Sequence, residues 1–363
     1  MGNKKYPIRV LHVVGIMNYG GAETLIMNWY RNIDRSKYQF DFLVHFSEKG
    51  KFDDEIKQLG GNIYYIPRYK GINHLEYISS FKKHLNNHIE HQIIHFHIRS
   101  TAKFLSKEAK KLSRKTILHS HSISERKGLS SVVKKITKLN INKNIDLKLA
   151  CSKEAGKWLF GEEKFSIIPN AIPIRNYKVD SVTRERLRKE INCENKRIIG
   201  HVGRFTYEKN HEYLLKIMEH VKDYDDLVLV LIGEGPLFKE IKIKSQGLNV
   251  ILLGAQSNIN EWLMAMDLFV FPSLYEGLGI AVVEAQASGL PVICSDRVPN
   301  ESKLISTVRY QNLEEMNKWL EYVIKIPVNT LDERVRINKE LCYSSYNIET
   351  NIEVIQEAYQ QFL

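Results

Sequence analysis

The stretch Leu268-Phe-Val-Phe-Pro-Ser-Leu-Tyr-Glu-Gly-Leu-Gly-Ile-Ala-Val-Val-Glu284 predicts the fold of the part of the chain around it. Its first four residues are apolar and β-prone, which indicates a short buried strand that Pro272 ends. Gly277 and Gly279 permit a tight loop, and the apolar run 280–287 predicts a buried helix. A strand, a glycine loop and a helix in this order are typical of a parallel α/β sheet.

The same alternation of short strands and helices occurs in two series, one before and one after residue 173. This pattern predicts an α/β protein with two doubly wound, Rossmann-like domains, which we expect to span residues 1–173 and 174–346. Residues 169–196 look like a linker, and 347–363 has the pattern of an amphipathic helix that could pack on either domain. Ligands of such sheets bind outside the carboxyl ends of the strands, so two facing sheets would enclose a cleft.

The composition indicates a soluble globular protein. Of 363 residues, 43% are hydrophobic and 26% are charged, which suits two ordinary cores. The four cysteines have no zinc-ligand spacing, and reduced thiols are the simplest interpretation. We expect neither a membrane span nor a secretion signal, because no apolar run is long enough.

The excess of positive charge, +11 overall, concentrates in residues 103–148. Thirteen basic residues oppose three acidic ones in this basic segment. A solvated helical face and a surface that docks on anionic phospholipid both remain open as explanations. Nucleic acid is disfavoured, because no pattern of stacking aromatic residues accompanies the charge.

The loop between Pro272 and the helix predicts a site for a sugar nucleotide. The unpaired N–H groups of residues Gly277, Leu278 and Gly279, at a helix N-terminus, suit a diphosphate. The carboxylate of Glu276 can accept hydrogen bonds from a sugar ring, and that of Glu284 from both hydroxyls of a ribose. Neither role needs a metal ion.

Three other strand ends carry candidate residues. Gly20 and Gly21 open the first helix, where they let a ligand approach the backbone. Arg204, after the first strand of the second series, and Lys209 can neutralise a leaving diphosphate without a metal. His121 can bind a sugar hydroxyl, with His119 as the competing candidate.

Several patterns are given structural interpretations. His95 and His97 are expected in the core or behind the site, and no metal site is expected among the histidines. Asp223-Tyr-Asp225 is expected to be a turn rather than a metal-binding pair. Gly233-Glu-Gly235-Pro236 predicts a tight turn from a strand into a helix, with a weaker possibility of ligand contact.

Taken in order, these motifs resemble the family 4 retaining glycosyltransferases of GT-B fold, especially the bacterial type that builds capsular or exopolysaccharide. The resemblance spans nearly the whole chain. It rests on Gly20-Gly21-Ala22-Glu23, His119-Ser-His121, Ile168-Pro169-Asn170, His201-Val-Gly203-Arg204 with Lys209-Asn210, Gly233-Glu-Gly235-Pro236 and the stretch from Glu276 to Glu284.

The resemblance implies a retaining, metal-independent hexosyltransferase without a cofactor, whose donor is a nucleotide sugar, most often a UDP-sugar. It implies that Glu284 holds the ribose, Glu276 the donor sugar, Arg204 and Lys209 the diphosphate, and His121 a donor hydroxyl. It implies that the final helix crosses back to the first domain. A lipid-linked saccharide acceptor, and a cytoplasmic protein peripheral to the inner face of the membrane, would agree with the basic segment.

Rival functions are weighed against this one. A nicotinamide-dependent oxidoreductase is disfavoured, because the first strand turn lacks the G-x-G-x-x-G pattern. A sugar-nucleotide 2-epimerase of similar fold would need acid and base residues where binding carboxylates stand. A non-catalytic partner of similar fold is the third alternative, and the intact set of charged candidates argues against it.

Overall fold

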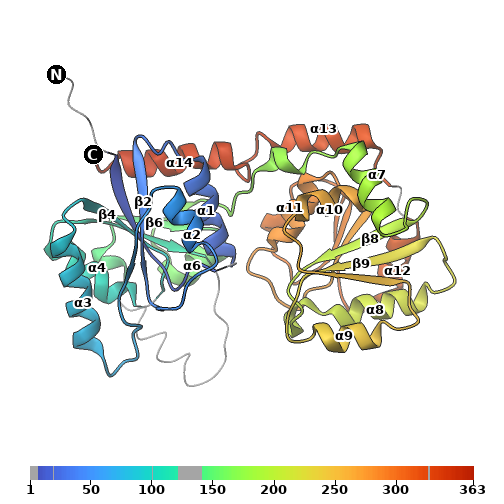
Figure 1. Cartoon of the computed structure of the whole chain (residues 1–363), viewed down its shortest axis with the longest axis horizontal. Coiled ribbons are helices and arrows are strands. Elements are labelled where there is room, and N and C mark those ends of the chain that lie inside the picture. Colours follow the sequence, from blue (N-terminus) through green and yellow to red (C-terminus); the bar gives the residue numbers. More distant parts are fainter. Residues whose placement is uncertain (1–6, 19, 100, 122–140, 326–327) are drawn as a thin grey trace. The chain divides into compact units, whose positions relative to one another are not determined.

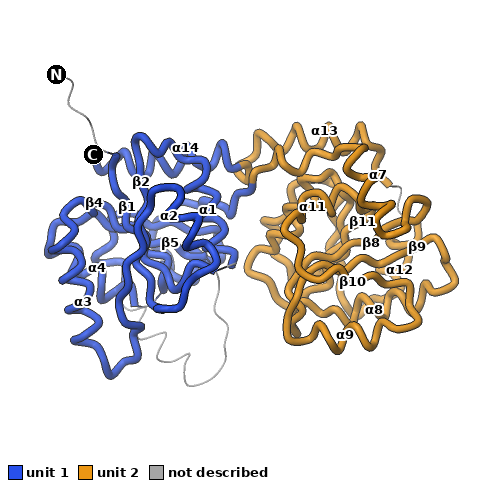
Figure 2. Tube along the Cα trace, in the orientation of Figure 1, with its two compact units in different colours: residues 1–172, 348–363 blue, residues 173–347 orange. Residues whose placement is uncertain are grey.

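The computed structural model describes residues 7–363 except residues 19, 100, 122–140 and 326–327 (Figure 1). The chain forms two compact units (Figure 2). Unit 1 comprises residues 1–172 and 348–363, and unit 2 comprises residues 173–347. The last segment of the chain therefore belongs to the same unit as the first.

Unit 1 is built on a seven-stranded parallel sheet with the order β3-β2-β1-β4-β5-β6-β7. Its strands are β1 (Ile8–Val13), β2 (Tyr38–Val44), β3 (Ile63–Tyr65), β4 (His91–Phe96), β5 (Lys115–Ser120), β6 (Leu147–Ala150) and β7 (Ser166–Ile167). Its helices are α1 (Gly21–Asn32), α2 (Asp53–Gln58), α3 (His74–Asn87), α4 (Ala102–Lys111), η1 (Ile141–Asn144), α6 (Lys153–Phe160) and α14 (Ile348–Gln360). The strand order reverses between β1 and β4, as in doubly wound folds.

Helices α1 and α14 cover one face of this sheet. Ile352, Ile355 and Tyr359 of α14 join Trp29 of α1 in a buried apolar cluster. The indole N–H of Trp29 donates to Oδ1 of Asn351 at 2.7 Å, so a buried polar contact fixes how the two helices pack. The amphipathic pattern predicted for the end of the chain is therefore buried against unit 1 (Figure 2).

Unit 2 repeats this architecture with a six-stranded parallel sheet in the order β10-β9-β8-β11-β12-β13. Its strands are β8 (Arg197–Val202), β9 (Leu227–Ile232), β10 (Val250–Gly254), β11 (Leu268–Phe271), β12 (Val292–Ser295) and β13 (Val308–Gln311). Its helices are η2 (Ile174–Tyr177), α7 (Ser181–Glu190), η3 (Tyr207–Lys209), α8 (His211–His220), α9 (Phe238–Lys244), α10 (Ile259–Ala265), α11 (Ile280–Ala287), η4 (Asn300–Ser302), α12 (Met316–Lys325) and α13 (Leu331–Leu341). The prediction of two doubly wound α/β domains is confirmed.

The structure corrects the interpretation of residues 169–196 as a linker. Their polar stretch contains η2 and α7, both within unit 2. Arg184 and Arg188 of α7 form ion pairs with Asp267, a carboxylate that is 5% exposed. Arg184 and Arg188, which contribute to the polar composition of the segment, therefore attach it to the rest of unit 2. Among the described residues, no helix is both long and apolar enough to cross a membrane.

Candidate functional site

The candidate site of unit 2 lies where its strand order reverses. Strands β8 and β11 are neighbours in the sheet, although two strands separate them in sequence. The segment with Arg204 and Lys209 follows β8, and the segment with Glu276 follows β11. Open α/β sheets bind ligands at this position, because the two loops diverge to opposite faces.

An ion pair joins these two loops. The Nζ atom of Lys209 bonds to Oε1 of Glu276, and it lies 4.7 Å from the centroid of the Phe271 ring. The side chains of Lys209 and Glu276 are 21% and 10% exposed, so the pair is held on the protein yet open to a ligand. Two predicted site residues, 67 positions apart, thus meet in space.

Backbone and side-chain hydrogen bonds reinforce the same junction. The N–H of Leu274 donates to the carbonyl of Glu208 at 2.8 Å, and Nδ2 of Asn210 donates to the carbonyl of Pro272 at 3.1 Å. Both loops are therefore fixed before any ligand arrives, which lowers the entropic penalty of binding.

The turn at Gly233 and Gly235 supports the loop that carries Arg204. Gly233 has φ +135°, and a Cβ there would lie 2.1 Å from the carbonyl oxygen of Gly203. The N–H of Phe205 donates to the carbonyl of Glu234 at 2.9 Å. These glycines let the two backbones touch, and Arg204 itself extends into solvent.

The N-terminus of α11 is open. Gly279 is its N-cap residue, with φ +78°, and no side chain caps the helix. Leu278 is 4% exposed and anchors the loop, while Gly277 is half-buried. The first turn also lacks an acidic residue. Free N–H donors and the positive end of the helix dipole therefore suit an anion here.

Glu284 has a partner that the sequence did not reveal. The hydroxyl of Tyr177, in η2, donates to Oε1 of Glu284 at 2.9 Å. The carbonyl of Tyr177 in turn accepts a bond from Oγ of Ser288, one helical turn further along. Burial raises the pKa of Glu284 to about 7, and the hydrogen bond from Tyr177 partly opposes that rise. Tyr177 lies in the stretch interpreted as a linker, where no motif marks it.

Gly20 and Gly21 begin helix α1 in unit 1. A Cβ at Gly20 would lie 2.3 Å from Oε2 of Glu23, so the carboxyl group of Glu23 folds back over the first turn. Burial raises the pKa of Glu23. Nδ2 of Asn170 is 3.8 Å from where a Cβ of Gly21 would stand. This helix N-terminus therefore already has a carboxyl group beside it.

The histidines of unit 1 form a cluster. His12, His95, His97, His119 and His121 stack at the carboxyl ends of β1, β4 and β5. Burial lowers the pKa of His12 and of His121 to about 3, and it lowers the pKa of the other three well below 6.5. All five are thus neutral imidazoles at physiological pH. His95 is fully buried, as expected, while His97 and His121 are half-buried.

The basic segment is less exposed than its composition implies. Arg114 is 8% exposed and donates to the carbonyls of Leu85 and Ile89. Lys110, Lys111 and Lys148 form ion pairs. Five members lie outside the described residues, namely Arg126, Lys127, Lys134, Lys135 and Lys138.

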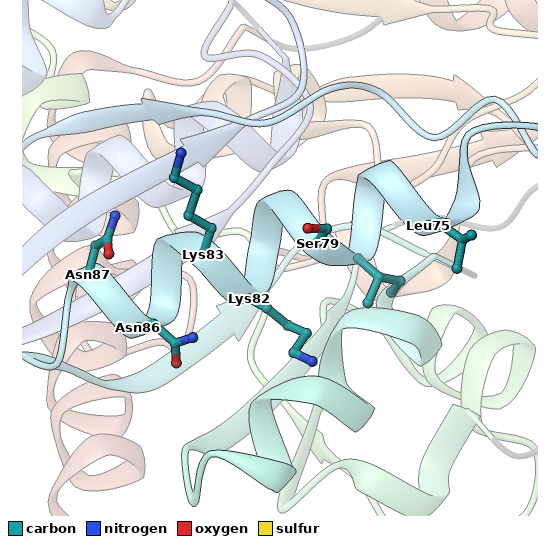
Figure 3. Close-up of a pocket in the computed structure, with 7 residues that line it drawn as sticks. Leu75, Ser79, Lys82, Lys83, Asn86 and Asn87 are labelled. Atoms are coloured by element: carbon teal, nitrogen blue, oxygen red, sulfur yellow. The ribbon is translucent and has the colours of Figure 1, made fainter.

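Two hollows lie along α3, of about 460 and 420 Å³, and the basic segment borders the first of them. Lys103, Lys107 and Lys143 line the first. Leu75, Ser79, Lys82 and Asn86 follow one another at helical spacing along the second (Figure 3). Leu75 is 84% exposed and borders both.

Asp223-Tyr-Asp225 lies in a turn before β9, as expected.

The switch point of unit 2 combines an open helix N-terminus with two cations, Arg204 and Lys209, and two carboxylates, those of Glu276 and Glu284. This arrangement can bind an anion and several hydroxyl groups side by side.

Comparison with known proteins identifies the family to which the chain is similar. The family described as Glycosyltransferase Family 4 matches residues 19–176, and Glycosyl transferases group 1 matches residues 183–326. EpsF of Bacillus subtilis (strain 168), named as a glycosyltransferase, is 33% identical over 97% of this chain and 96% of its own. A UDP-Gal:alpha-D-GlcNAc-diphosphoundecaprenol alpha-1,3-galactosyltransferase of Escherichia coli is 28% identical over 54% of each chain.

Solved structures share the fold of this chain. HepE of Anabaena, solved in complex with UDP, superposes with a TM-score of 0.79 and 18% identity, over 97% of this chain and all of HepE. The two parallel sheets described above are thus those of the GT-B architecture. The chain belongs to the glycosyltransferases of family 4.

Proposed function

We propose that this glycosyltransferase moves a sugar from a UDP-sugar to a lipid-linked saccharide acceptor, with retained configuration and without a metal ion, in surface polysaccharide biosynthesis. The observation that carries the proposal is the Lys209–Glu276 ion pair beside the open N-terminus of α11. The E. coli relative, whose name states a UDP-galactose donor and a diphosphoundecaprenol-linked acceptor, supports the donor and acceptor classes.

Each group of unit 2 has a proposed role. Glu284 accepts hydrogen bonds from the ribose hydroxyls, and Tyr177 holds its carboxylate in place. Glu276 accepts hydrogen bonds from the donor sugar. Arg204, Lys209 and the amides of residues 277–279 hold the diphosphate and stabilise the charge that develops on it as the glycosidic bond breaks.

In the proposed reaction the acceptor hydroxyl attacks the anomeric carbon from the side of the leaving group. The C–O bond to the diphosphate breaks, the new C–O bond forms on the same face, and a phosphate oxygen takes the acceptor's proton. A pair of carboxylates at glycosidase spacing is then unnecessary. In unit 1, His121 is proposed to bind a sugar hydroxyl, while Gly20 and Gly21 let substrate approach the backbone.

The test is a transfer assay with labelled UDP-glucose, UDP-galactose and UDP-N-acetylglucosamine, each with an undecaprenyl-diphosphate saccharide. We expect label in the lipid fraction from one of these donors, an anomeric NMR signal of retained configuration, and an unchanged rate in EDTA. Release of a C2-epimerised sugar would instead assign an epimerase. UDP binding without transfer or epimerisation would assign a non-catalytic partner.

We also propose that unit 1 docks on the inner face of the cytoplasmic membrane. The hollows along α3 combine Lys82, Lys103 and Lys107 with the exposed side chain of Leu75. Lysines attract anionic headgroups, at about 1 kcal/mol each, and an exposed leucine adds apolar contact. The remainder of the basic segment would add to this charge.

Sedimentation with vesicles tests this docking. We expect binding to phosphatidylcholine vesicles only when phosphatidylglycerol is included, and Lys103→Glu with Lys107→Glu should abolish it. Lys216→Glu with Lys222→Glu, two exposed lysines of unit 2, is the matched control with the same change in net charge. Equal loss in the control would show a general effect of net charge and would contradict a defined docking surface.

A further inference from the structure

The histidine cluster of unit 1 contains more hydrogen-bonding capacity than the protein uses. His119 is 2% exposed, and neither of its ring nitrogens has a partner at good hydrogen-bond geometry, although the backbone of Ile168 lies near enough to favour the charged form of the ring. Nδ1 of His121 is likewise buried without a partner. Buried polar atoms are normally satisfied, so unpaired nitrogens that point into one cluster need a reason.

The nitrogens of three of these histidines converge. Ligand atoms of His97, His119 and His121 all lie within 4.8 Å of one another. Nδ1 of His97 is 2.8 Å from Nε2 of His121, and the rings of His119 and His121 are stacked 4.2 Å apart. The three side chains come from the ends of two neighbouring strands, β4 and β5, so the sheet itself sets their spacing.

We propose that His97, His119 and His121 form a binding site for a divalent transition-metal ion of the zinc class. Neutral imidazole nitrogens are preferred ligands of Zn²⁺, Co²⁺ and Ni²⁺. Three protein ligands leave a fourth position for water or another oxygen ligand. Because His97 and His121 are half-buried, the ion has a path into the site.

His12 supplies the outer support that a histidine ligand needs. Its Nδ1 lies 2.9 Å from Nε2 of His97. When the metal binds Nδ1 of His97, Nε2 of His97 carries the proton and donates a hydrogen bond to Nδ1 of His12. This hydrogen bond fixes the tautomer and the orientation of the His97 ring. The unpartnered Nε2 of His12 can carry the proton that this tautomer shift moves.

A second histidine group in unit 1 provides the contrast. His88, Glu90 and His91 also lie within 4.8 Å of one another. However, Nε2 of His91 bonds to Asp41 at 2.8 Å and its Nδ1 faces His84, so both nitrogens are already engaged. His88 also bonds to Glu90. This group therefore serves as the control.

The metal site is a property of unit 1 and takes no part in the neutralisation of the diphosphate by Arg204 and Lys209. A bound metal ion would also affect sugar transfer, and this consequence rests on the proposed function. If His121 binds a sugar hydroxyl, an ion on its ring blocks that contact, and micromolar Zn²⁺ should inhibit transfer.

The experiment uses untagged, metal-stripped full-length protein titrated with Co²⁺. We expect the visible absorption of four-coordinate cobalt at one ion per chain, and its disappearance on addition of Zn²⁺. His119→Gln and His97→Gln should each weaken cobalt binding by about tenfold or more, and His88→Gln should bind like the wild type. Circular dichroism establishes that each variant is folded.

Absence of the cobalt absorption in the wild type would overturn the proposal. So would its persistence in folded His97→Gln, or its loss in His88→Gln. The absorption needs no substrate, so a failed transfer assay leaves this result unaffected, and the two proposals can fail separately.

Discussion

The two units have the same sheet topology but fill their switch points with different chemistry. In unit 1 the ends of β1, β4 and β5 carry five neutral, stacked imidazoles. In unit 2 the ends of β8 and β11 lead to the Lys209–Glu276 ion pair and to the exposed Arg204. Topology fixes where side chains gather, and residue type decides what they can bind.

Solvent access explains why the charges lie in unit 2. The side chains of Lys209 and Glu276 keep 21% and 10% of their surface exposed, and each charge lies beside the opposite one. His12 and His95 are fully buried, where burial favours the uncharged ring. A diphosphate needs the first environment, and neutral imidazoles, which can bind a transition metal without carrying charge, suit the second.

The largest expected effect comes from removing a charge in unit 2. Glu276→Gln should lower kcat/KM for sugar transfer by about 10²-fold, because charge-assisted hydrogen bonds to the donor sugar are lost and Lys209 is left unpaired. Glu208→Gln, an exposed carboxylate next to Lys209, is the matched control and should change the rate little. Equal losses in both variants would mean that local charge, and not contact with the sugar, sets the rate.

A smaller effect is expected from the turn that supports Arg204. Gly233→Ala should lower the free energy of unfolding by about 3 kcal/mol, because φ +135° is strained for alanine and the new Cβ meets the carbonyl of Gly203. Gly247→Ala, at φ +81° with nothing within 4 Å, should lower it by only about 1 kcal/mol. Urea unfolding measures both, and equal values would show that the close approach of the two backbones is unimportant.

The smallest effect concerns the pH dependence of nucleoside binding. Ribose hydroxyls donate to the ionised form of Glu284, so affinity should rise by up to tenfold per pH unit towards pH 7 and level off above it. Uridine is the suitable ligand, because a terminal phosphate titrates near pH 6. Tyr177→Phe removes a hydrogen bond that lowers the pKa of Glu284, and should shift the curve to higher pH. A flat calorimetric profile in the wild type would exclude Glu284 as the ribose ligand.

Much of the fold was predictable, because parallel strands buried on both faces are continuous apolar runs. Strand β11 and helix α11 have the predicted bounds, since proline or glycine follows them closely. Strand β13, Val308–Gln311, was not predicted, because alternating polar residues make an edge strand look like a loop. Helix α7 was missed for a related reason, as Arg184 and Arg188 are paired with Asp267 from a distant part of the chain.

For the candidate site, local motifs predicted which residues follow the strands, and the structure shows which of them touch. The Lys209–Glu276 contact follows from the adjacency of β8 and β11, which no local pattern encodes. Tyr177 has no motif of its own. The sequence did contain a signal of the histidine cluster, since histidines alternate at the ends of β4 and β5. The structure adds that His12 lies opposite His95 in the β1–β4 register. We expected no metal site among the histidines, and the convergence across strands on which the proposed one rests is not visible in sequence spacing.

The central claim is that the switch point of unit 2 binds a uridine nucleotide, and calorimetry with UDP, GDP and ADP on the wild type and Glu284→Ala tests it most directly. We predict that UDP binds the wild type and that the mutation weakens this binding by at least about tenfold, because the hydrogen bonds to the ribose are lost. UDP binding that is unchanged in Glu284→Ala, or absent from the wild type, would contradict the account.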